Sequence, residues 1–421
     1  MEIIDTAVIG AGQTGLAVSR YLTEAGRDHV VLDRGRVAES WRSARWDSLR
    51  LLTPNWMTRL PGWNYTGPDA DGFMTAAELA GYLEDYAASF GAPVRVHTPV
   101  TDVSPMAHGY RVTTFRGSWF ARNVVIATGP GRHLPAVHRQ LTPGLRQIHT
   151  SSYRNPGTLP PGGVLVVGAS ASGTQIAAEL RRSGRAVVLA AGSHTRLPRR
   201  YRGMDIMWWL EQSGMLSRTI DDVPDAREAR SQPSLQLRGG PPEDQADLTA
   251  LSRLGVEITG RLIGADGYGV RFADDLHTTV SEADERMRRT LAKIDAFIES
   301  SGLESEVLPA EAVRTATVPP ARNEIDLSSA GITSVVWATG FRFRYPWLRV
   351  PVFDRDGHVM HRQGITAATG LYVIGERFLH RRDSSFIDGA RHDARTITEH
   401  IRTSHRSQQA KTRRRREVRV P

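Results

Sequence analysis

The chain contains no cysteine among its 421 residues. This absence excludes disulfide bonds, cysteine-ligated metal clusters and redox chemistry that passes through a pair of thiols. Long apolar runs are also missing, and the first apolar stretch begins almost at Met1, which leaves no room for a removable leader. We therefore expect a cytoplasmic protein with no membrane partner.

Lysine is nearly absent, with Lys293 and Lys411 as the two examples, so arginine supplies almost all of the basic charge. The formal net charge is +9 at pH 7, but residues 404–421 alone contribute +6 of it. Such a terminal run is typical of a solvated, disordered tail, and the alternative is a segment that touches nucleic acid or an acidic surface. We expect a basic, disordered tail over residues 404–421 and no specific nucleic-acid partner.

The first 33 residues carry the motif around which the chain is organised. A short apolar run predicts a buried strand, and Gly10, Gly12 and Gly15 follow it in the spacing G-x-G-x-x-G before a helical pattern. The first glycine turns the chain, the second lets backbone N–H groups approach a pyrophosphate, and the third lets helix and strand pack closely. A second strand ends at Asp33, whose carboxylate is placed to accept hydrogen bonds from a ribose diol. The segment therefore predicts a dinucleotide site.

The same pattern restarts near residue 160. Gly168, which follows Gly10 by 158 residues, begins a second loop with Ser170 in the place of the middle glycine and Gly173 as the third. A serine side chain is small enough to permit close backbone approach. Because strand, loop, helix and strand recur in order, the sequence predicts an internal duplication and an α/β fold with two Rossmann-like dinucleotide-binding domains.

The two units differ at the end of the second strand, where the later unit has Ala191 instead of an acid. Without a carboxylate to repel it, a ribose 2′-phosphate could bind there. Four arginines downstream could pair with that phosphate, and the alternative is a solvated basic loop. These arginines are Arg196, Arg199, Arg200 and Arg202. The pattern favours NADPH over NADH.

With these landmarks, the chain resembles the class B flavin-dependent monooxygenases, which include the flavin-containing monooxygenases, the Baeyer–Villiger monooxygenases and the plant auxin-forming enzymes that oxidatively decarboxylate indolepyruvate. The resemblance covers residues 1 to about 403. It rests on GAGQTG with Asp33, SW followed by WDSLRLLTP, GASASG, ATGF at 338–341 and the H-x-x-x-Y segment from His149 to Tyr153. The PRRYRG segment at 198–203 points to a bacterial branch. The chain departs from the family fingerprint at Leu145, where the family has a glycine.

The resemblance implies a glutathione-reductase-like two-domain flavoprotein. Its FAD-binding domain would take residues 1–158 and 331–403, and its NADPH-binding domain residues 159–330. The implied activity uses NADPH to reduce FAD, after which O2 forms a C4a-(hydro)peroxyflavin that oxygenates a small organic substrate. The bond oxidised stays open between N- or S-oxygenation, Baeyer–Villiger reaction and oxidative decarboxylation. The alternatives are an NAD(P)H-dependent reductase that passes electrons to a quinone or protein acceptor, and a redox-sensing flavoprotein. No resident metal is expected, and a homodimer is one option for assembly.

The resemblance also assigns candidate cofactor residues. Those expected to bind FAD are Gly10, Gly12, Gln13, Thr14, Gly15, Asp33, Arg34, Ser40, Trp41, Val100, Ala127, Thr128, Gly129, Gly375 and Glu376. Those expected to bind NADPH are Gly168, Ala169, Ser170, Ser172, Gly173, Ser193, Arg199, Arg200, Thr339 and Gly340.

Catalytic candidates are Asn55, Arg200 and His380. We expect the substrate to lie above the flavin, between walls from residues 46–56, 203–209 and 378–386. A helix starting near Ser385 could aim its N-terminus at the flavin, and plain packing of a terminal helix is the alternative.

Overall fold

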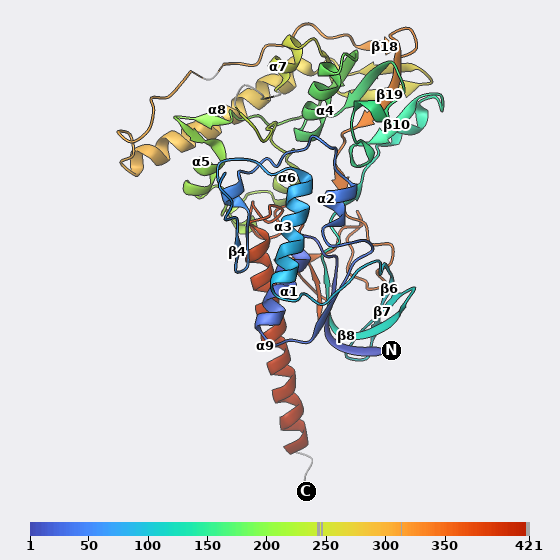
Figure 1. Cartoon of the computed structure of the whole chain (residues 1–421), viewed down its shortest axis with the longest axis vertical. Coiled ribbons are helices and arrows are strands. Elements are labelled where there is room, and N and C mark those ends of the chain that lie inside the picture. The colour runs from blue at the N-terminus through green and yellow to red at the C-terminus, as the bar shows by residue number, and fades with distance from the viewer. Residues whose placement is uncertain (242–244, 246, 313, 418–421) are drawn as a thin grey trace.

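The computed structural model describes residues 1–241, 245, 247–312 and 314–417, with the backbone alone from residue 405. Two α/β domains lie one above the other, and the last helix, α9 (Ala390–Glu417), extends away from the lower one (Figure 1). Each domain is built on its own sheet, which confirms the predicted fold class of two Rossmann-type domains.

The first domain contains a nine-stranded sheet whose central strands are parallel, in the order β23-β8-β1-β2-β5. Every residue in the second half of β1 is buried, because helices cover the parallel core. Helix α1 (Gln13–Glu24) packs against α9, and α3 (Ala76–Ser89) begins with a capping box between Thr75 and Glu78. The strands of this sheet are β1 (Glu2–Ile9), β2 (His29–Leu32), β5 (Val94–Arg95), β6 (Val100–Met106), β7 (Gly109–Thr114), β8 (Gly117–Ile126), β21 (His361–Arg362), β22 (Ile365–Thr366) and β23 (Leu371–Val373).

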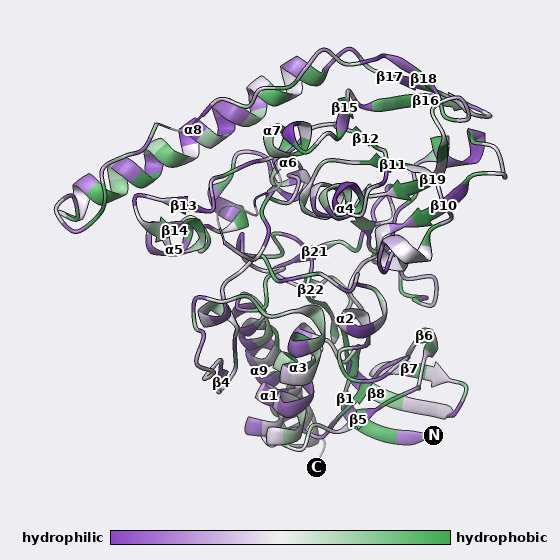
Figure 2. Cartoon of the chain, turned by 45° about the horizontal axis from the view of Figure 1, so that its top comes forward, coloured by the Kyte–Doolittle hydropathy of each residue, from purple (hydrophilic) through white to green (hydrophobic). Residues whose placement is uncertain are grey.

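The second domain contains a parallel five-stranded sheet in the order β10-β19-β11-β12-β15. These strands are mostly green in Figure 2, whereas α8 (Leu276–Ser300) alternates green and purple, as a helix with one apolar face does. A small antiparallel sheet of β16 (Leu262–Asp266), β17 (Gly269–Phe272) and β18 (Glu324–Asp326) adjoins them. The five strands are β10 (Arg146–His149), β11 (Gly163–Val167), β12 (Val187–Ala190), β15 (Glu257–Thr259) and β19 (Ile332–Trp337).

Shorter elements complete both domains. They are α2 (Glu39–Ser43), α4 (Ala171–Arg182), α5 (Ile206–Gln212), α6 (Ala226–Ser231), α7 (Leu248–Arg253), η1 (Asn55–Met57), β3 (Arg59–Leu60), β4 (Trp63–Asn64), β13 (Arg200–Tyr201) and β14 (Met204–Asp205).

The pairing of the strands places both domain boundaries at other residues than expected. Strands β10 and β19, which lie in the stretches assigned to the FAD-binding domain, pair with each other and with β11 in the second sheet. The chain crosses between domains at β9 (Gly131–Arg132) and β20 (Phe341–Arg342), which pair antiparallel. The boundaries near residues 158 and 331 were wrong because the Pro/Gly stretch around residue 160 is a turn inside the second domain.

The last helix also differs from expectation. It begins at Ala390 rather than near Ser385, because residues 383–389 form turns in which Phe386 N–H donates to the Asp383 carbonyl at 2.7 Å. Its backbone stays helical to Glu417, which corrects the expected disorder from residue 404; residues 418–421 of that tail lie outside the described residues. Within the described residues, no helix has both the length and the apolar character needed to cross a bilayer.

Candidate functional site

The first glycine loop has the geometry that its spacing predicts. Gly10 has φ +114°, and a Cβ there would overlap the carbonyl of Ala127. A Cβ on Gly15 would overlap the carbonyl of Gly10 and lie 3.3 Å from the Ala127 Cβ. Both glycines are therefore required by the close packing of β1, α1 and the end of β8.

The second loop repeats these contacts. Gly168 has φ +109° and a Cβ there would overlap the carbonyl of Ala338, and a Cβ on Gly173 would lie 3.2 Å from the Ala338 Cβ. Ser170 has φ −83° and ψ −174°, almost identical to φ −85° and ψ −175° at Gly12. The second loop is thus a structural copy of the first, and serine is tolerated because this position needs no left-handed backbone.

Both loops suit the diphosphate of a dinucleotide. Gly12 and Ser170 are the N-cap residues of α1 and α4, and neither helix has a side-chain cap, so backbone N–H groups of the first turn are left for an anion. A Cβ on Gly12 would meet no protein atom within 4 Å. Glycine there is consistent with a ligand that approaches the backbone closely.

Asp33 holds the first loop in place. Its Oδ2 accepts the N–H of Ala11 at 2.6 Å and its Oδ1 accepts the N–H of Gly35 at 2.8 Å. Trp41 donates its indole N–H to Gln13 Oε1 at 3.2 Å, which connects α2 to the first residue of α1. Each carboxylate oxygen of Asp33 keeps a second lone pair that could accept a hydrogen bond from a ribose hydroxyl.

The remaining predicted FAD residues border this loop. Ala127 contacts Gly10 and Gly15 as described above, and a Cβ on Gly375 would lie 3.2 Å from Thr14. Arg34, Ser40 and Thr128 are exposed, Gly129 is half-buried, and Val100 begins β6.

Glu376 is held by two side chains that the sequence did not indicate. The Tyr345 hydroxyl donates to Glu376 Oε1 at 3.0 Å, and His361 Nε2 lies 3.3 Å from Oε2. Because His361 Nδ1 accepts the N–H of Gly364, the imidazole proton is assigned to Nε2, which donates to the carboxylate. Both carboxylate oxygens of Glu376 are therefore fixed beside the start of α1.

His149, the first residue of the H-x-x-x-Y segment, links the end of β10 to the turn between β19 and β20. Its Nδ1 accepts the N–H of Ser151 at 3.1 Å, so its Nε2–H donates to the carbonyl of Gly340 at 2.9 Å. Burial lowers the pKa of His149, which keeps it neutral in this role. Gly340 is a predicted NADPH residue, and its neighbour Thr339 donates to the His133 carbonyl at 2.7 Å.

Tyr153, which closes the same segment, has a hydroxyl that donates to Glu179 Oε2 at 2.7 Å. The Ser48 hydroxyl donates to the other oxygen of Glu179, also at 2.7 Å. The segment therefore ties α4 to residues from the first part of the chain.

Among the predicted arginines, Arg199 is fully engaged. It is 3% exposed, its Nε donates to Asp205 Oδ2 at 2.7 Å, and its Nη1 donates to the Leu52 carbonyl at 2.7 Å. Its guanidinium also lies over the ring of Phe73, 4.4 Å from the centroid. Burial lowers the pKa of Arg199. These contacts give it a structural role that leaves no free fork for a phosphate.

The other three arginines differ from one another. Arg196 is buried and pairs with Asp284 at 2.5 Å and Asp247 at 3.0 Å, and Arg202 pairs with Asp295 at 3.1 Å. Arg200 is exposed, and its side chain makes no hydrogen bond to the described residues. Of the predicted NADPH residues, Ser193 is also exposed. Gly168 and Ala169 lie just before α4, and Ser172 and Gly173 lie in its first turn.

The catalytic candidates Asn55 and His380 lie in different settings. Asn55 is 4% exposed; its amide donates to the Asp69 carbonyl at 2.9 Å and accepts the N–H of Met74 at 2.8 Å. The side chain of Asn55 therefore cross-links the loop between residues 55 and 74. His380 is half-buried in the segment before α9, where its backbone N–H donates to Ser384 Oγ at 3.2 Å.

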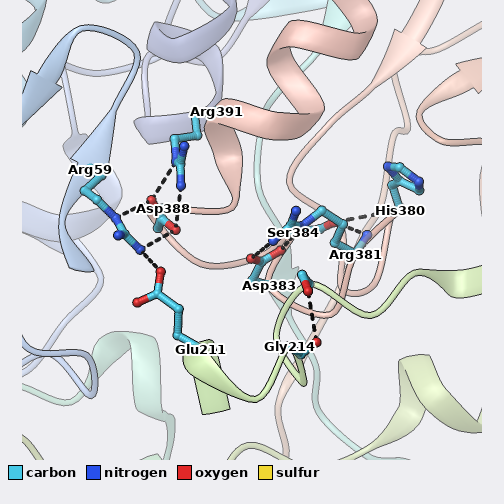
Figure 3. Close-up of polar contacts among 10 residues, drawn as sticks. Arg59, Glu211, Gly214, His380, Arg381, Asp383, Ser384, Asp388 and Arg391 are labelled. Atoms are coloured by element: carbon cyan, nitrogen blue, oxygen red, sulfur yellow. Dashed lines mark hydrogen bonds and ion pairs between the residues drawn. The ribbon is translucent and has the colours of Figure 1, made fainter. Parts of the chain in front are cut away.

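Figure 3 shows the polar network before α9, where Asp388 lies between Arg59 and Arg391 and Glu211 reaches Arg59 from α5. The carboxylate of Asp383, in the same segment, pairs with Arg381 at 2.9 Å. Asp383, Asp388 and His392 place donor atoms within 4.8 Å of one another, as a metal site would. Three guanidinium groups already neutralise the two carboxylates, which is unfavourable for a bound cation.

Asp393, in the first turn of α9, is a buried carboxylate at 1% exposure, and neither of its oxygens has a hydrogen-bond partner among the described residues. Burial, helped by the charge of Asp383, raises the pKa of Asp393 to about 7. This group is neutral over much of the acidic range.

Comparison with known proteins identifies the family. A family model described as pyridine nucleotide-disulphide oxidoreductase matches residues 7–208. An uncharacterized oxidoreductase CzcO-like of Geobacillus kaustophilus is 31% identical over 405 residues, which cover 95% of this chain and 99% of that protein. The indole-3-pyruvate monooxygenase YUCCA8 of Oryza sativa subsp. indica is 30% identical over 226 residues, 48% of this chain and 53% of that protein. The chain belongs to the same family as this CzcO-like oxidoreductase.

A solved structure agrees at the level of the fold. The flavin-containing monooxygenase from Stenotrophomonas maltophilia aligns with a TM-score of 0.64 at 20% identity, over 96% of this chain and 99% of that one. The two glycine loops of this chain, each at the N-terminus of a helix, provide two sites of the kind that binds a dinucleotide.

Residues from the three segments expected to line a substrate site, or directly next to them, pack together. Met57, Met207 and Trp209 are buried in one apolar cluster, with Trp56 and Phe386 packed against it. The cluster joins residues from the first domain, from α5 and from the segment before α9.

The sequence analysis missed Tyr345 and His361, because no local motif marks them. Their role depends on their contacts with Glu376, which join segments distant in sequence.

Proposed function

We propose that this protein is an FAD-dependent monooxygenase that uses NADPH and O2 to oxygenate a small organic substrate. The observation that supports this most is the duplication of the glycine loop, with the same close contacts and the same N-cap backbone in both domains. Two dinucleotide sites in one chain suit a reaction in which one bound nucleotide reduces the other.

The residues of the chain have separable roles in this proposal. The loop from Gly10 to Gly15 binds the FAD diphosphate, while Asp33 and Glu376 accept hydrogen bonds from its hydroxyl groups. The loop at Gly168 binds the NADPH diphosphate, and His149 keeps Gly340 beside it. Bound FAD supplies the hydride acceptor and, once reduced, the group that activates O2.

The apolar cluster around Trp209 would exclude water from the reacting atoms. The rice relative is named for indole-3-pyruvate. Oxidative decarboxylation is accordingly one reaction type for this chain, beside N- or S-oxygenation and Baeyer–Villiger oxidation.

Rapid mixing tests the proposal. The purified protein should retain FAD, be reduced by NADPH without air, and show on mixing with O2 a transient absorbance distinct from that of both oxidised and reduced flavin. Immediate return to oxidised flavin with stoichiometric hydrogen peroxide would contradict it. NADPH consumption that depends on a quinone and yields no oxygenated product would favour the reductase alternative. Protein that comes out colourless and refuses added FAD would overturn both.

A further inference from the structure

The duplication shows which residue of the second domain stands where Asp33 stands in the first. The N–H of Gly10 donates to the Leu32 carbonyl at 2.8 Å, and that of Gly168 donates to the Ala190 carbonyl at 2.9 Å. The N–H of Asp33 donates to the last residue of β5 at 3.1 Å, and that of Ala191 donates to the last residue of β15 at 2.9 Å. Ala191 is therefore the counterpart of Asp33. The position whose side chain we expect to bind a ribose in the first domain carries no charge in the second.

The cation that lies beside Ala191 is Arg261, which is not one of the four arginines that the sequence indicated. Strand β15 lies beside β12 in the parallel sheet and ends at Thr259, so Arg261 emerges at the same edge as the Gly168 loop. A Cβ on Gly192 would be 3.7 Å from both Cγ and Cδ of Arg261. The aliphatic part of Arg261 thus lies across the backbone that directly follows Ala191.

The guanidinium of Arg261 is anchored at one side and free at its tip. The side chain is 66% exposed, with Nε 3.6 Å from Asp275 Oδ2, and Asp275 Oδ1 accepts the Arg261 backbone N–H at 3.0 Å. Neither terminal nitrogen makes a hydrogen bond to the described residues. Two parallel N–H groups of this kind match the oxygens of a phosphate.

Other charged side chains around this loop are committed elsewhere. Arg286 donates to the His194 carbonyl at 2.9 Å and lies 3.5 Å from Glu282, so it fixes the loop after Gly192. Arg196 and Arg199 are buried in ion pairs.

We propose that Arg261 binds the 2′-phosphate of NADPH and sets the preference of this protein for NADPH over NADH. The inference rests on the proposed function and deepens it, because it assigns the choice of nucleotide to a residue from the neighbouring strand. The uncharged Ala191 removes the repulsion that a carboxylate would exert, and Arg261 adds the attraction.

The test uses the flavin-loaded protein and measures the dissociation constants of NADP+, NAD+ and 2′,5′-ADP by calorimetry. In Arg261→Ala the dissociation constants for NADP+ and 2′,5′-ADP should rise roughly 10- to 100-fold, the usual size for a lost charge-assisted contact, with little change for NAD+. Arg261→Lys should recover part of the loss, since the charge returns without the fork. Arg271→Ala, an exposed arginine on β17 of the adjoining sheet, should match the wild type for all three ligands.

The outcomes separate this inference from the proposed function. An unchanged ratio of NADP+ to NAD+ affinity in Arg261→Ala overturns the inference and leaves the proposed function standing, as does discrimination that is lost in Arg200→Ala instead. Wild-type protein that binds none of the three ligands overturns the proposed function as well. Because Arg261 is exposed, the variant should keep the wild-type melting temperature, and a lower one would identify its effect as structural.

Discussion

The guanidinium of Arg59 and the carboxylate of Asp388 form a two-point ion pair, with Nε 2.8 Å from Oδ1 and Nη2 2.9 Å from Oδ2. Arg59 lies on β3 and Asp388 in the turns that precede α9, so the pair joins segments 329 positions apart. Arg59 also contacts Glu211 on α5 of the second domain (Figure 3). One side chain thus ties both domains to the start of the last helix.

Arg59→Ala should destabilise the protein, because it leaves Arg391 as the one ion-pair partner of the 6%-exposed Asp388 side chain among the described residues. We expect the free energy of unfolding to fall by about 2 kcal/mol, less than for a fully buried pair because Arg59 is 27% exposed. Urea titration of the flavin-free protein measures it. The control is Arg395→Ala, whose pair with Glu399 is mostly exposed on α9, and it should behave as the wild type. Equal midpoints for the two variants would show that the network does not stabilise the fold.

Gly12→Ala should separate folding from flavin binding. The position has ordinary negative φ and its Cβ would meet no protein atom, so the free energy of unfolding of the apoprotein should change by less than about 1 kcal/mol. The same methyl group would block close approach of a diphosphate, and FAD affinity should fall roughly 100-fold through several lost N–H contacts. Flavin fluorescence gives the affinity. Gly81→Ala on α3, where a Cβ also meets nothing, is the matched control and should bind FAD normally. Tight FAD binding by Gly12→Ala would place the diphosphate elsewhere.

The nucleotide loops could be predicted because four of their glycines are each required by a close contact with a nearby backbone. Gly10, Gly15, Gly168 and Gly173 are each required by an atom a few residues away or at the end of an adjacent strand. Ser170 could be accepted for the same reason, since only size matters there. The spacing of such residues is therefore visible in the sequence alone.

The arginines show where local reasoning stops. Arg199 follows the second unit closely in sequence, yet it is buried against Asp205, while Arg261 reaches Gly192 because β15 happens to lie beside β12. Strand order and burial of a charge depend on contacts between distant segments, which no spacing rule encodes. The pairing of β10 with β19, which puts both strands in the second domain, also depends on contacts between distant segments.

Tyr345→Phe should weaken FAD binding while the fold persists. The ring stays in the core, but the hydroxyl that donates to Glu376 Oε1 is removed, so the carboxylate loses one of its two supports. We expect the FAD dissociation constant to rise roughly 5- to 10-fold, in line with one hydrogen bond to a charged group. Tyr110→Phe removes a buried hydroxyl that donates to the Thr369 carbonyl in the same domain and should leave FAD binding unchanged. If both variants bind FAD as the wild type does, Tyr345 does not position Glu376.

Asp393→Asn should change how stability depends on pH. Burial raises the pKa of Asp393 from 3.8 in the unfolded chain to about 7 in the fold, where the charge of Asp383 opposes ionisation and that of Arg381 offsets part of the effect. Between these values the folded protein binds a proton that the unfolded chain does not, so this group lowers stability as pH rises from about 4 to about 7. The asparagine variant stays neutral, so it should match the wild type near pH 4 and exceed it at pH 8 by up to roughly 4 kcal/mol. Urea titrations at several pH values measure this, with the exposed Asp71→Asn as control. A constant difference between Asp393→Asn and wild type across the range would show that the carboxylate does not titrate in the fold.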